Sequence, residues 1–157
     1  MATREDLVQR YREGPGIVEQ AVAGLSDEEL DRRPADGGWS PREVVNHLAD
    51  SEMTSAIRVR KLLAEDSPTL QGYDEEEFAR RLYYAVRPIG PSLATLRGVR
   101  EATATILENL DEDGWRRAGT HEESGAYSVT TWLDIYAAHA HDHAEQIRRA
   151  LGADART

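Results

Sequence analysis

The stretch that decides the fold is YAAHAHDHAEQI, residues 136–147, which holds three of the five histidines of the chain. In a strand, residues two apart share a face, so His139, His141 and His143 would project together. In a helix, residues four apart share a face, so His139 and His143 would form a pair and His141 would point elsewhere. The secondary structure of this stretch therefore decides which histidines can act together.

The residues around this stretch favour a helix. Residues 131–151 are rich in Ala, Glu, Gln, Arg and Leu, which are good helix formers, and contain few β-branched residues. Apolar and aromatic residues recur at spacings of three and four, and Gly152 follows as a stop signal. The predicted buried stripe consists of Trp132, Ile135, Tyr136, His139, His143, Ile147 and Ala150. The pattern predicts a helix that carries two imidazoles, one turn apart, on an apolar face.

Length and composition limit the class of protein. With 157 residues, the chain is expected to form one domain over residues 1–157 with a substantial core. The net charge of -10 disfavours binding to nucleic acid or to an anionic membrane surface. Because there is no cysteine, disulfides, thiolate metal sites and a cysteine nucleophile are excluded. The first residues do not look like a signal peptide and no apolar run reaches membrane-spanning length, so we expect a cytoplasmic protein.

Working outward from the last helix, the sequence predicts three more long helices and two shorter ones. Ser40 and Pro41 give the clearest start, a side-chain cap followed by proline at the first helical position. Pro15, between two glycines, should kink the first helix or break it in two. A capping box at residues 26–29 starts a short turn of helix. The other predicted helices cover residues 3–24, 40–64, 74–86 and 92–110.

These elements predict an all-α fold. Four substantial helices without a convincing strand pattern are typical of a four-helix bundle. Residues 111–127 are polar and are expected to form a long loop or a short hairpin before the last helix, which Ser128 or Thr130 would cap. The uneven lengths of the connections argue against a simple up-down-up-down arrangement.

The chemistry of the chain is expected to come from histidines. His47 lies on the predicted inner face of the second long helix, beside Val44 and Leu48. One imidazole from that helix and the pair His139 and His143 from the last helix can bind one divalent ion, because an i, i+4 pair spans about 6 Å. Three protein ligands leave a coordination position for water or substrate, as in catalytic zinc sites.

Simpler interpretations exist for each of these residues. A lone histidine on an apolar face is more often a hydrogen-bonded core residue than a ligand, and helices carry histidine pairs by chance. Ala140 stands where a zinc protease would carry its glutamate, so the H-E-x-x-H motif is absent. We expect His141 in solvent and Gln146 either to hydrogen-bond a ligand or to cover the edge of the bundle. His121 is either a fourth ligand or no ligand.

Two segments carry a resemblance to a known family. Residues 25–34 and 38–48, LSDEELDRRP and GWSPREVVNHL, resemble the N-terminal half of the DinB-like superfamily, which includes bacillithiol S-transferases and mycothiol-dependent maleylpyruvate isomerases. Residues 139–147, HAHDHAEQI, are similar to the H-x-x-x-H-x-x-Q-I ending of that family. The resemblance implies a four-helix bundle of DinB-like type with one long crossover connection, and frequently a homodimer. It also implies a divalent ion, zinc or nickel, held by His47, His139 and His143.

The resemblance also suggests a reaction. Characterised members use the ion to activate the thiol of a small cofactor such as bacillithiol or mycothiol, which then adds to an electrophile. Our hypothesis is therefore a metal-dependent transferase with a small-molecule substrate. The alternatives are a hydrolase that uses metal-bound hydroxide, a non-enzymatic stress-associated metal-binding protein, and a purely structural bundle. No catalytic residue beyond the three ligands is predicted. The loops at residues 71–77 and 111–127 are expected to shape the mouth of the site.

Overall fold

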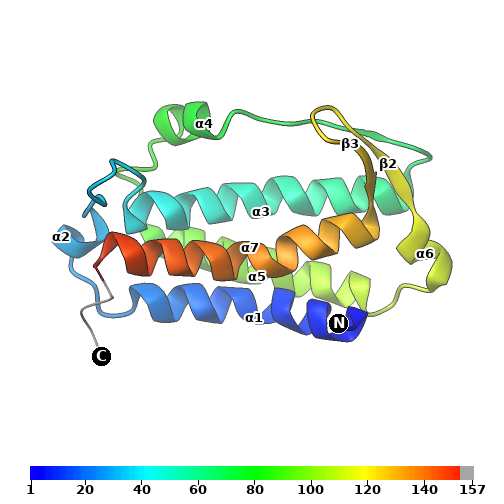
Figure 1. The fold of residues 1–157 in the computed structure, drawn as a ribbon, viewed down its shortest axis with the longest axis horizontal. Coiled ribbons are helices and arrows are strands. Elements are labelled where there is room, and N and C mark those ends of the chain that lie inside the picture. Colours follow the sequence, from blue (N-terminus) through cyan, green and yellow to red (C-terminus); the bar gives the residue numbers. More distant parts are fainter. Residues whose placement is uncertain (153–157) are drawn as a thin grey trace.

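The computed structural model describes residues 1–152, and four long helices dominate it. They lie side by side as a bundle, so the predicted all-α four-helix bundle is confirmed (Figure 1). The long helices are α1 (Arg4–Val22), α3 (Pro41–Ala64), α5 (Ile89–Leu107) and α7 (Val129–Ala150). The shorter helices are α2 (Asp27–Leu30), α4 (Glu75–Arg81) and α6 (Glu112–Arg116).

Side-chain caps define where three of the long helices begin. The side chains of Thr3, Ser40 and Ser128 each accept a hydrogen bond from the backbone N–H three residues further on. Helix α5 follows Pro88 without a side-chain cap and begins three residues before the predicted Ser92. Pro91 fits in its first turn, because the N–H groups there have no partner within the helix.

The course of the chain confirms the long crossover. Helices α1 and α3 each pack against both α5 and α7, so α1 and α3 occupy diagonal corners of the bundle. Helices α3 and α5 run in the same direction, so the connection over residues 65–88 returns along the length of the bundle (Figure 1). It carries α4 past the outer side of α3 (Figure 1).

A small sheet ties this crossover to the segment before α7. It consists of β1 (Thr69–Leu70), β2 (Ala118–His121) and β3 (Gly125–Ser128), with β1 parallel to β2 and β2 antiparallel to β3. Of the two structures predicted for residues 111–127, the hairpin is therefore the one that forms, and α6 precedes it. Gly119 allows the close pairing, because a Cβ there would lie 2.3 Å from the carbonyl oxygen of Pro68.

Besides the start of α5, three local predictions were wrong. The helix predicted to reach Val86 ends at Arg81, and Tyr83 adopts a left-handed conformation with φ of 58°, which a helix cannot continue. Helix α5 ends at Leu107 rather than at residue 110. Ile135 is 45% exposed and does not belong to the buried stripe of α7. Instead Ala140 and Ala144 are buried, because α7 packs closely against both α1 and α3.

Two apolar clusters fill the bundle, one around Trp132 and one around Leu48. On α3 and α5, Glu52 and Arg100 lie between the residues of the two clusters and form an ion pair with Nε and Oε2 2.9 Å apart. These side chains are only 0% and 1% exposed. Tyr11 completes the polar layer, because its hydroxyl donates to Glu52 over 2.5 Å.

This polar layer explains the Gly14-Pro15 sequence inside α1. Pro15 has no N–H, so it cannot donate to the carbonyl of Tyr11 one turn earlier. Arg100 Nη1 donates to that carbonyl instead, at 2.7 Å. Gly14 makes room for the guanidinium, since a Cβ there would lie 2.4 Å from Nη1. Helix α1 is therefore continuous through Pro15, so of the two outcomes predicted there, a kink or a break, the break does not occur.

Among the helices of residues 1–152, none is both long and apolar enough to cross a membrane.

Candidate metal centre

Helix packing brings the three predicted histidines together. His47 lies near the start of α3, and His139 and His143 lie one turn apart in α7, which packs against α3. The ring of His47 is 5.5 Å from that of His139 and 4.8 Å from that of His143, and the latter two rings are 4.5 Å apart. One ring nitrogen of each lies within 4.8 Å of the others, so the three can hold a metal ion.

The spacing of the nitrogens fits the geometry of a metal site. His139 Nε2 and His143 Nε2 are 3.2 Å apart. Two nitrogens bound to one tetrahedral zinc, each at 2.0–2.1 Å, are separated by roughly 3.3 Å. Two lone pairs at this distance repel each other unless a hydrogen or a cation lies between them. Imidazole nitrogens are also suitable ligands for zinc and nickel.

Gln146 orients one of these rings. Its Oε1 lies 2.6 Å from Nδ1 of His143. An amide oxygen only accepts, so Nδ1 carries the hydrogen and Nε2 is left as the basic nitrogen that faces His139. Of the two roles predicted for Gln146, the hydrogen bond to a candidate ligand is the one observed.

Burial keeps the three imidazoles neutral near pH 7. It lowers the pKa of His47 to about 3, and the neighbouring imidazole of His143 acts in the same direction. Burial lowers the pKa of His139 to about 2, again helped by the other two rings. The pKa of His143 is lowered by burial as well, while the hydrogen bond with Gln146 acts in the opposite direction. A neutral imidazole is the form that binds a metal.

Some ring nitrogens of the cluster also lack hydrogen-bond partners within the described protein. Nδ1 of His47 and Nδ1 of His139 are buried and have no hydrogen-bond partner among residues 1–152. Most buried polar atoms in folded proteins have a partner, and exceptions are frequent at functional sites. The unpartnered nitrogens therefore fit a ligand-binding site better than they fit hydrogen-bonded core histidines or a purely structural bundle.

Aromatic side chains border the cluster on two sides. The ring of Trp39 lies 4.9 Å from that of His47, and the ring of Tyr136 lies 5.5 Å from that of His139. Trp39 was not among the residues predicted for the site. Its position directly before the cap of α3 was the available signal, because that cap places the tryptophan about two turns from His47.

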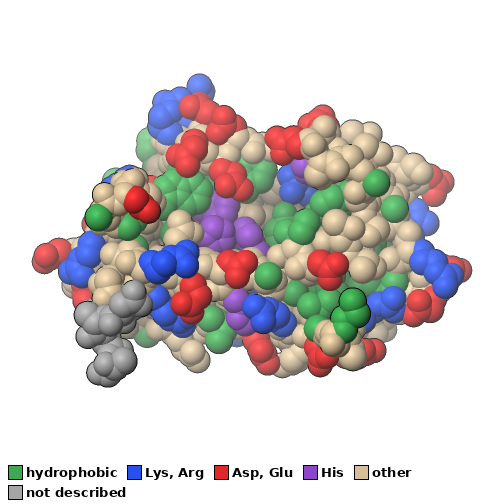
Figure 2. All heavy atoms as spheres, in the orientation of Figure 1, with side chains coloured by type: hydrophobic (Ala, Val, Ile, Leu, Met, Phe, Trp, Pro, Cys, Tyr) green, Lys and Arg blue, Asp and Glu red, His purple; other side chains and the backbone are tan. Residues whose placement is uncertain are grey.

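A cavity of about 250 Å³ opens beside His139. Figure 2 shows histidine side chains, in purple, at the bottom of a hollow between the crossover and the hairpin. The predicted contribution of both loops to the mouth is confirmed, because the cavity lining comes from α3, α7, residues 73–75 and the hairpin. The lining residues are Ser51, Arg58, Tyr73, Glu75, His121, Glu123, Ile135, Tyr136 and His139.

The other two histidines lie outside the cluster. His121 is buried in the cavity wall, where its Nδ1 accepts a hydrogen bond from the backbone N–H of Glu123 at 3.2 Å. His141 faces away from the pair, as predicted; it is half-buried, and its Nε2 lies 3.0 Å from the carbonyl oxygen of Arg10 in α1. Among residues 1–152, only His47, His139 and His143 form a group of three or more potential metal ligands.

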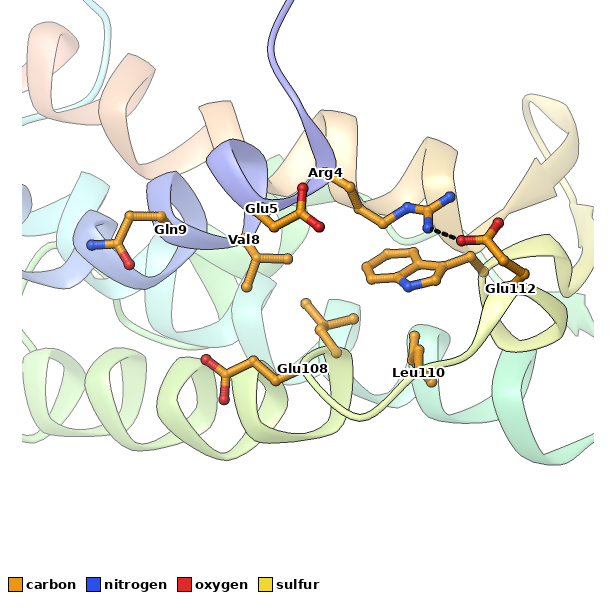
Figure 3. A pocket seen from close by; sticks show the side chains of 9 residues that line it. Arg4, Glu5, Val8, Gln9, Glu108, Leu110 and Glu112 are labelled. Carbon is orange, nitrogen blue, oxygen red and sulfur yellow. Dashed lines mark hydrogen bonds and ion pairs between the residues drawn. The ribbon is translucent and has the colours of Figure 1, made fainter.

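A larger cavity, of about 380 Å³, lies at the end of the bundle where α1 begins (Figure 3). Its one lining cation, Arg4, lies over the ring of Trp115 and pairs with Glu112 at 2.7 Å. It contains no histidine. This cavity is therefore separate from the metal centre.

The fold and the site together define a helical-bundle protein with a three-histidine candidate metal centre. The model of the DinB superfamily matches residues 10–147, and the chain belongs to this superfamily. The resemblance stated from the sequence is thereby confirmed.

Relatives and a solved structure at 30% identity or more match over most of the chain. A protein of Oceanobacillus iheyensis named "Putative metal-dependent hydrolase" is 35% identical over 142 residues, which are 90% of this chain and 82% of the relative. "Putative metal-dependent hydrolase YfiT" of Bacillus subtilis is 31% identical over 145 residues, 92% of this chain and 82% of the relative. The structure of YfiT, described as a probable metal-dependent hydrolase with an unusual four-helix bundle topology, has a TM-score of 0.88 and 30% identity, and covers 97% of this chain and 91% of its own.

Two crystal structures of mycothiol-dependent maleylpyruvate isomerase share the fold. They have TM-scores of 0.74 and 0.66 at 10% and 14% identity, and each match covers 93% of this chain and 61% of the isomerase. At this level of identity, the likeness establishes the fold alone.

Proposed function

We propose that this protein is a metal-dependent enzyme that activates a low-molecular-weight thiol, such as bacillithiol or mycothiol, for addition to an electrophile. His47, His139 and His143 would hold a divalent ion, zinc or nickel. The observation that carries the proposal is the 3.2 Å separation of the two Nε2 atoms in α7, with a third imidazole facing them from α3. When bound, the ion supplies a Lewis acid that lowers the pKa of a ligating thiol or water.

The side chains around the ion have distinct tasks in this proposal. The three neutral imidazoles add no charge of their own, so they leave the positive charge of the ion available to the substrate. Gln146 fixes the orientation of His143 through its Nδ1 hydrogen. Trp39 and Tyr136 cover the rings of His47 and His139 and exclude water from those sides.

The groups next to the imidazoles favour a thiol over water as the nucleophile. A metal ion lowers the pKa of bound water as it lowers that of a bound thiol, but hydrolysis also needs a group that protonates the leaving group. Trp39, Tyr136 and Gln146 contact the rings, and burial raises the pKa of Tyr136. The nearby carboxylate of Asp50 is held in an ion pair with Arg87. None of these side chains is a suitable proton donor near pH 7, and a thiolate that adds to an electrophile has no amine or alcohol leaving group to protonate.

The second candidate function is metal-dependent hydrolysis, and the names of the relatives at 31% and 35% identity favour it. In that case the proton would have to be moved by groups in the cavity wall. His121 and Glu75 line the cavity and are the available candidates.

One experiment separates the two functions. The purified chain is loaded with zinc or nickel, its metal content is measured by elemental analysis, and it is incubated with a model electrophile in the presence and absence of several thiols. We expect a product that requires a thiol. A product formed equally well without thiol would support the hydrolase, and a loaded protein that forms neither product would support a non-enzymatic metal-binding role.

A further inference from the structure

Arg58 is a buried cation that forms no direct ion pair with a carboxylate of residues 1–152. It lies in α3 and is 9% exposed. The other two buried arginines of the described chain, Arg42 and Arg100, both pair with carboxylates. Burying a charge without its counter-charge is costly. This exception is therefore a candidate for binding an anion from outside the protein.

Several N–H groups of the Arg58 guanidinium have no hydrogen-bond acceptor among the described residues. Its Nη1 donates to the hydroxyl of Tyr136 at 3.2 Å, and its Nη2 donates to the carbonyl of Gln71 at 2.6 Å. Its Nε is buried and has no partner among the described residues. A guanidinium carries five N–H bonds, so more than half of its donors remain for another acceptor. The two hydrogen bonds hold the group in place in the wall of the cavity.

Tyr136 links Arg58 to the metal centre. Its hydroxyl accepts the hydrogen bond from Arg58, and its ring lies 5.5 Å from the ring of His139. All three side chains line the same cavity of about 250 Å³. A single small molecule can therefore touch the guanidinium at one end and the imidazole of His139, one of the three candidate ligands, at the other.

The mouth of the same cavity is negatively charged. Glu75 at the start of α4 and Glu123 in the hairpin line it, and neither forms an ion pair with a cation of residues 1–152. The carboxyl group of Glu123 lies against Gly72, where a Cβ would be 2.7 Å from it. Partial burial, Glu76 and Glu123 raise the pKa of Glu75. Figure 2 shows acidic side chains, in red, above the hollow.

We propose that the cavity binds a small zwitterion of the amino-acid type, with its carboxylate on Arg58 and its ammonium group toward Glu75 and Glu123. Charges of both signs line one cavity without pairing with each other, which suits a ligand that carries both. A simple carboxylate would be repelled at the mouth, and a simple amine would find no acceptor charge inside. This inference rests on the proposed function in one respect, since the third group of the ligand, the thiol, would face the metal centre on the side of His139.

Four matched probes without a free thiol test this recognition separately from thiol chemistry. They are S-methylcysteine, 3-(methylthio)propionate, 2-(methylthio)ethylamine and 2-(methylthio)ethanol, which carry both charges, the carboxylate, the ammonium group or neither. Their dissociation constants are measured by titration calorimetry on metal-loaded and chelated protein. We expect S-methylcysteine to bind at least about 10-fold more tightly than the other three, because charged hydrogen bonds are formed at both ends.

Substitutions test which side chains bind the carboxylate of the ligand and which bind its ammonium group. Arg58→Gln should weaken the two carboxylate probes by about 10- to 100-fold and leave the amine and the alcohol unchanged. Glu75→Gln combined with Glu123→Gln should weaken the two ammonium probes by a few-fold and strengthen 3-(methylthio)propionate. Arg60→Gln is the matched control, because Arg60 is a partly buried arginine of the same helix outside the cavity. It should leave all four constants unchanged.

The proposal is overturned if the four probes bind equally, if none binds, or if Arg58→Gln weakens all of them alike. Should Arg58→Gln fail to fold, Arg58→Lys keeps the cation, and the two glutamate substitutions affect only exposed side chains. The metal content reports separately on the histidine site. A chain that binds metal but shows no charge preference contradicts this inference alone, whereas a charge preference without metal binding contradicts the proposed function alone.

Discussion

Two sets of buried polar side chains lie in the same bundle, and they differ in how many of their polar atoms have a hydrogen-bond partner within the protein. In the Arg100–Glu52 layer, the guanidinium donates to Glu52, to the carbonyl of Tyr11 and to the carbonyl of Tyr136, so it joins all four long helices. In the histidine cluster, two ring nitrogens have no partner among residues 1–152 and two others face each other at 3.2 Å. The polar atoms of the first group have partners within the protein, whereas the second group leaves ring nitrogens available to a ligand.

The comparison teaches that burial alone does not identify a functional group. Arg100 and His47 are equally buried, at 1% exposure each. What distinguishes them is whether each polar atom has a partner in the protein. The two groups should therefore respond in opposite ways to substitution: one through the stability of the fold, the other through the binding of a ligand.

The largest expected effect is the loss of Arg100. Arg100→Met leaves Glu52 as a buried charge without its partner, so the free energy of unfolding should fall by about 3–5 kcal/mol. Denaturant unfolding of the chelated protein measures this loss. A decrease below about 1 kcal/mol would show that the layer does not hold the bundle together, and Arg97→Met, which removes an exposed ion pair, is the control.

The next largest effect is the loss of metal binding in His47→Ala. Removing one of three ligands should weaken zinc or nickel binding by at least about 100-fold, on the order of 3 kcal/mol. The stability of the chelated protein should change less than in Arg100→Met. His141→Ala is the matched control, since this histidine contacts α1 instead of the cluster. Equal metal content in the two variants by elemental analysis would reject the site.

The pH dependence of stability should come third in size. The pKa of His47 in the folded chain is about 3, below its ordinary value near 6.5, so the unfolded chain takes up the proton first. The stability of chelated protein is therefore fully present above pH 6.5 and falls as the pH is lowered toward 3. Between pH 7 and pH 5 this histidine alone should account for about 2 kcal/mol.

The measurement is urea unfolding of chelated protein at pH 7, 6 and 5. His47→Gln should lose less stability over this range than the parent chain, because glutamine does not take up a proton. His141→Gln should keep the slope of the parent chain. If His47→Gln also keeps that slope, His47 does not titrate as its burial predicts.

The smallest effect should follow from Gln146→Ala. The substitution removes the acceptor that orients His143 while all three ligands remain, so metal affinity should fall roughly 10-fold. Competition with a metal-binding dye measures the change, and Gln146→Glu should retain the affinity because a carboxylate also accepts the Nδ1 hydrogen. An unchanged affinity in Gln146→Ala would mean that this glutamine only covers the edge of the bundle.

The sequence predicted the local features of the site well and its surroundings poorly. The pairing of His139 with His143, and the exclusion of His141, follow from the pitch of a helix and needed no knowledge of the fold. The inward direction of His47 followed from its neighbours Val44 and Leu48. By contrast, nothing local marked Arg58, Glu75 or Glu123 as members of one cavity, because α3, the crossover and the hairpin supply one each. That these three line the site is a result of tertiary structure.

By itself, the sequence determined the helices, their caps, the histidine pair and the DinB-type pattern, because each depends on residues within a few turns of one another. Tertiary structure decided that α3 and α7 meet at the histidines, that Arg100 replaces the hydrogen bond lost at Pro15, and that Ile135 faces outward. The physical reason is the separation along the chain of the residues that determine each feature. Helix geometry repeats every 3.6 residues, whereas the side of each helix that is buried depends on neighbours that lie dozens of residues away in the chain.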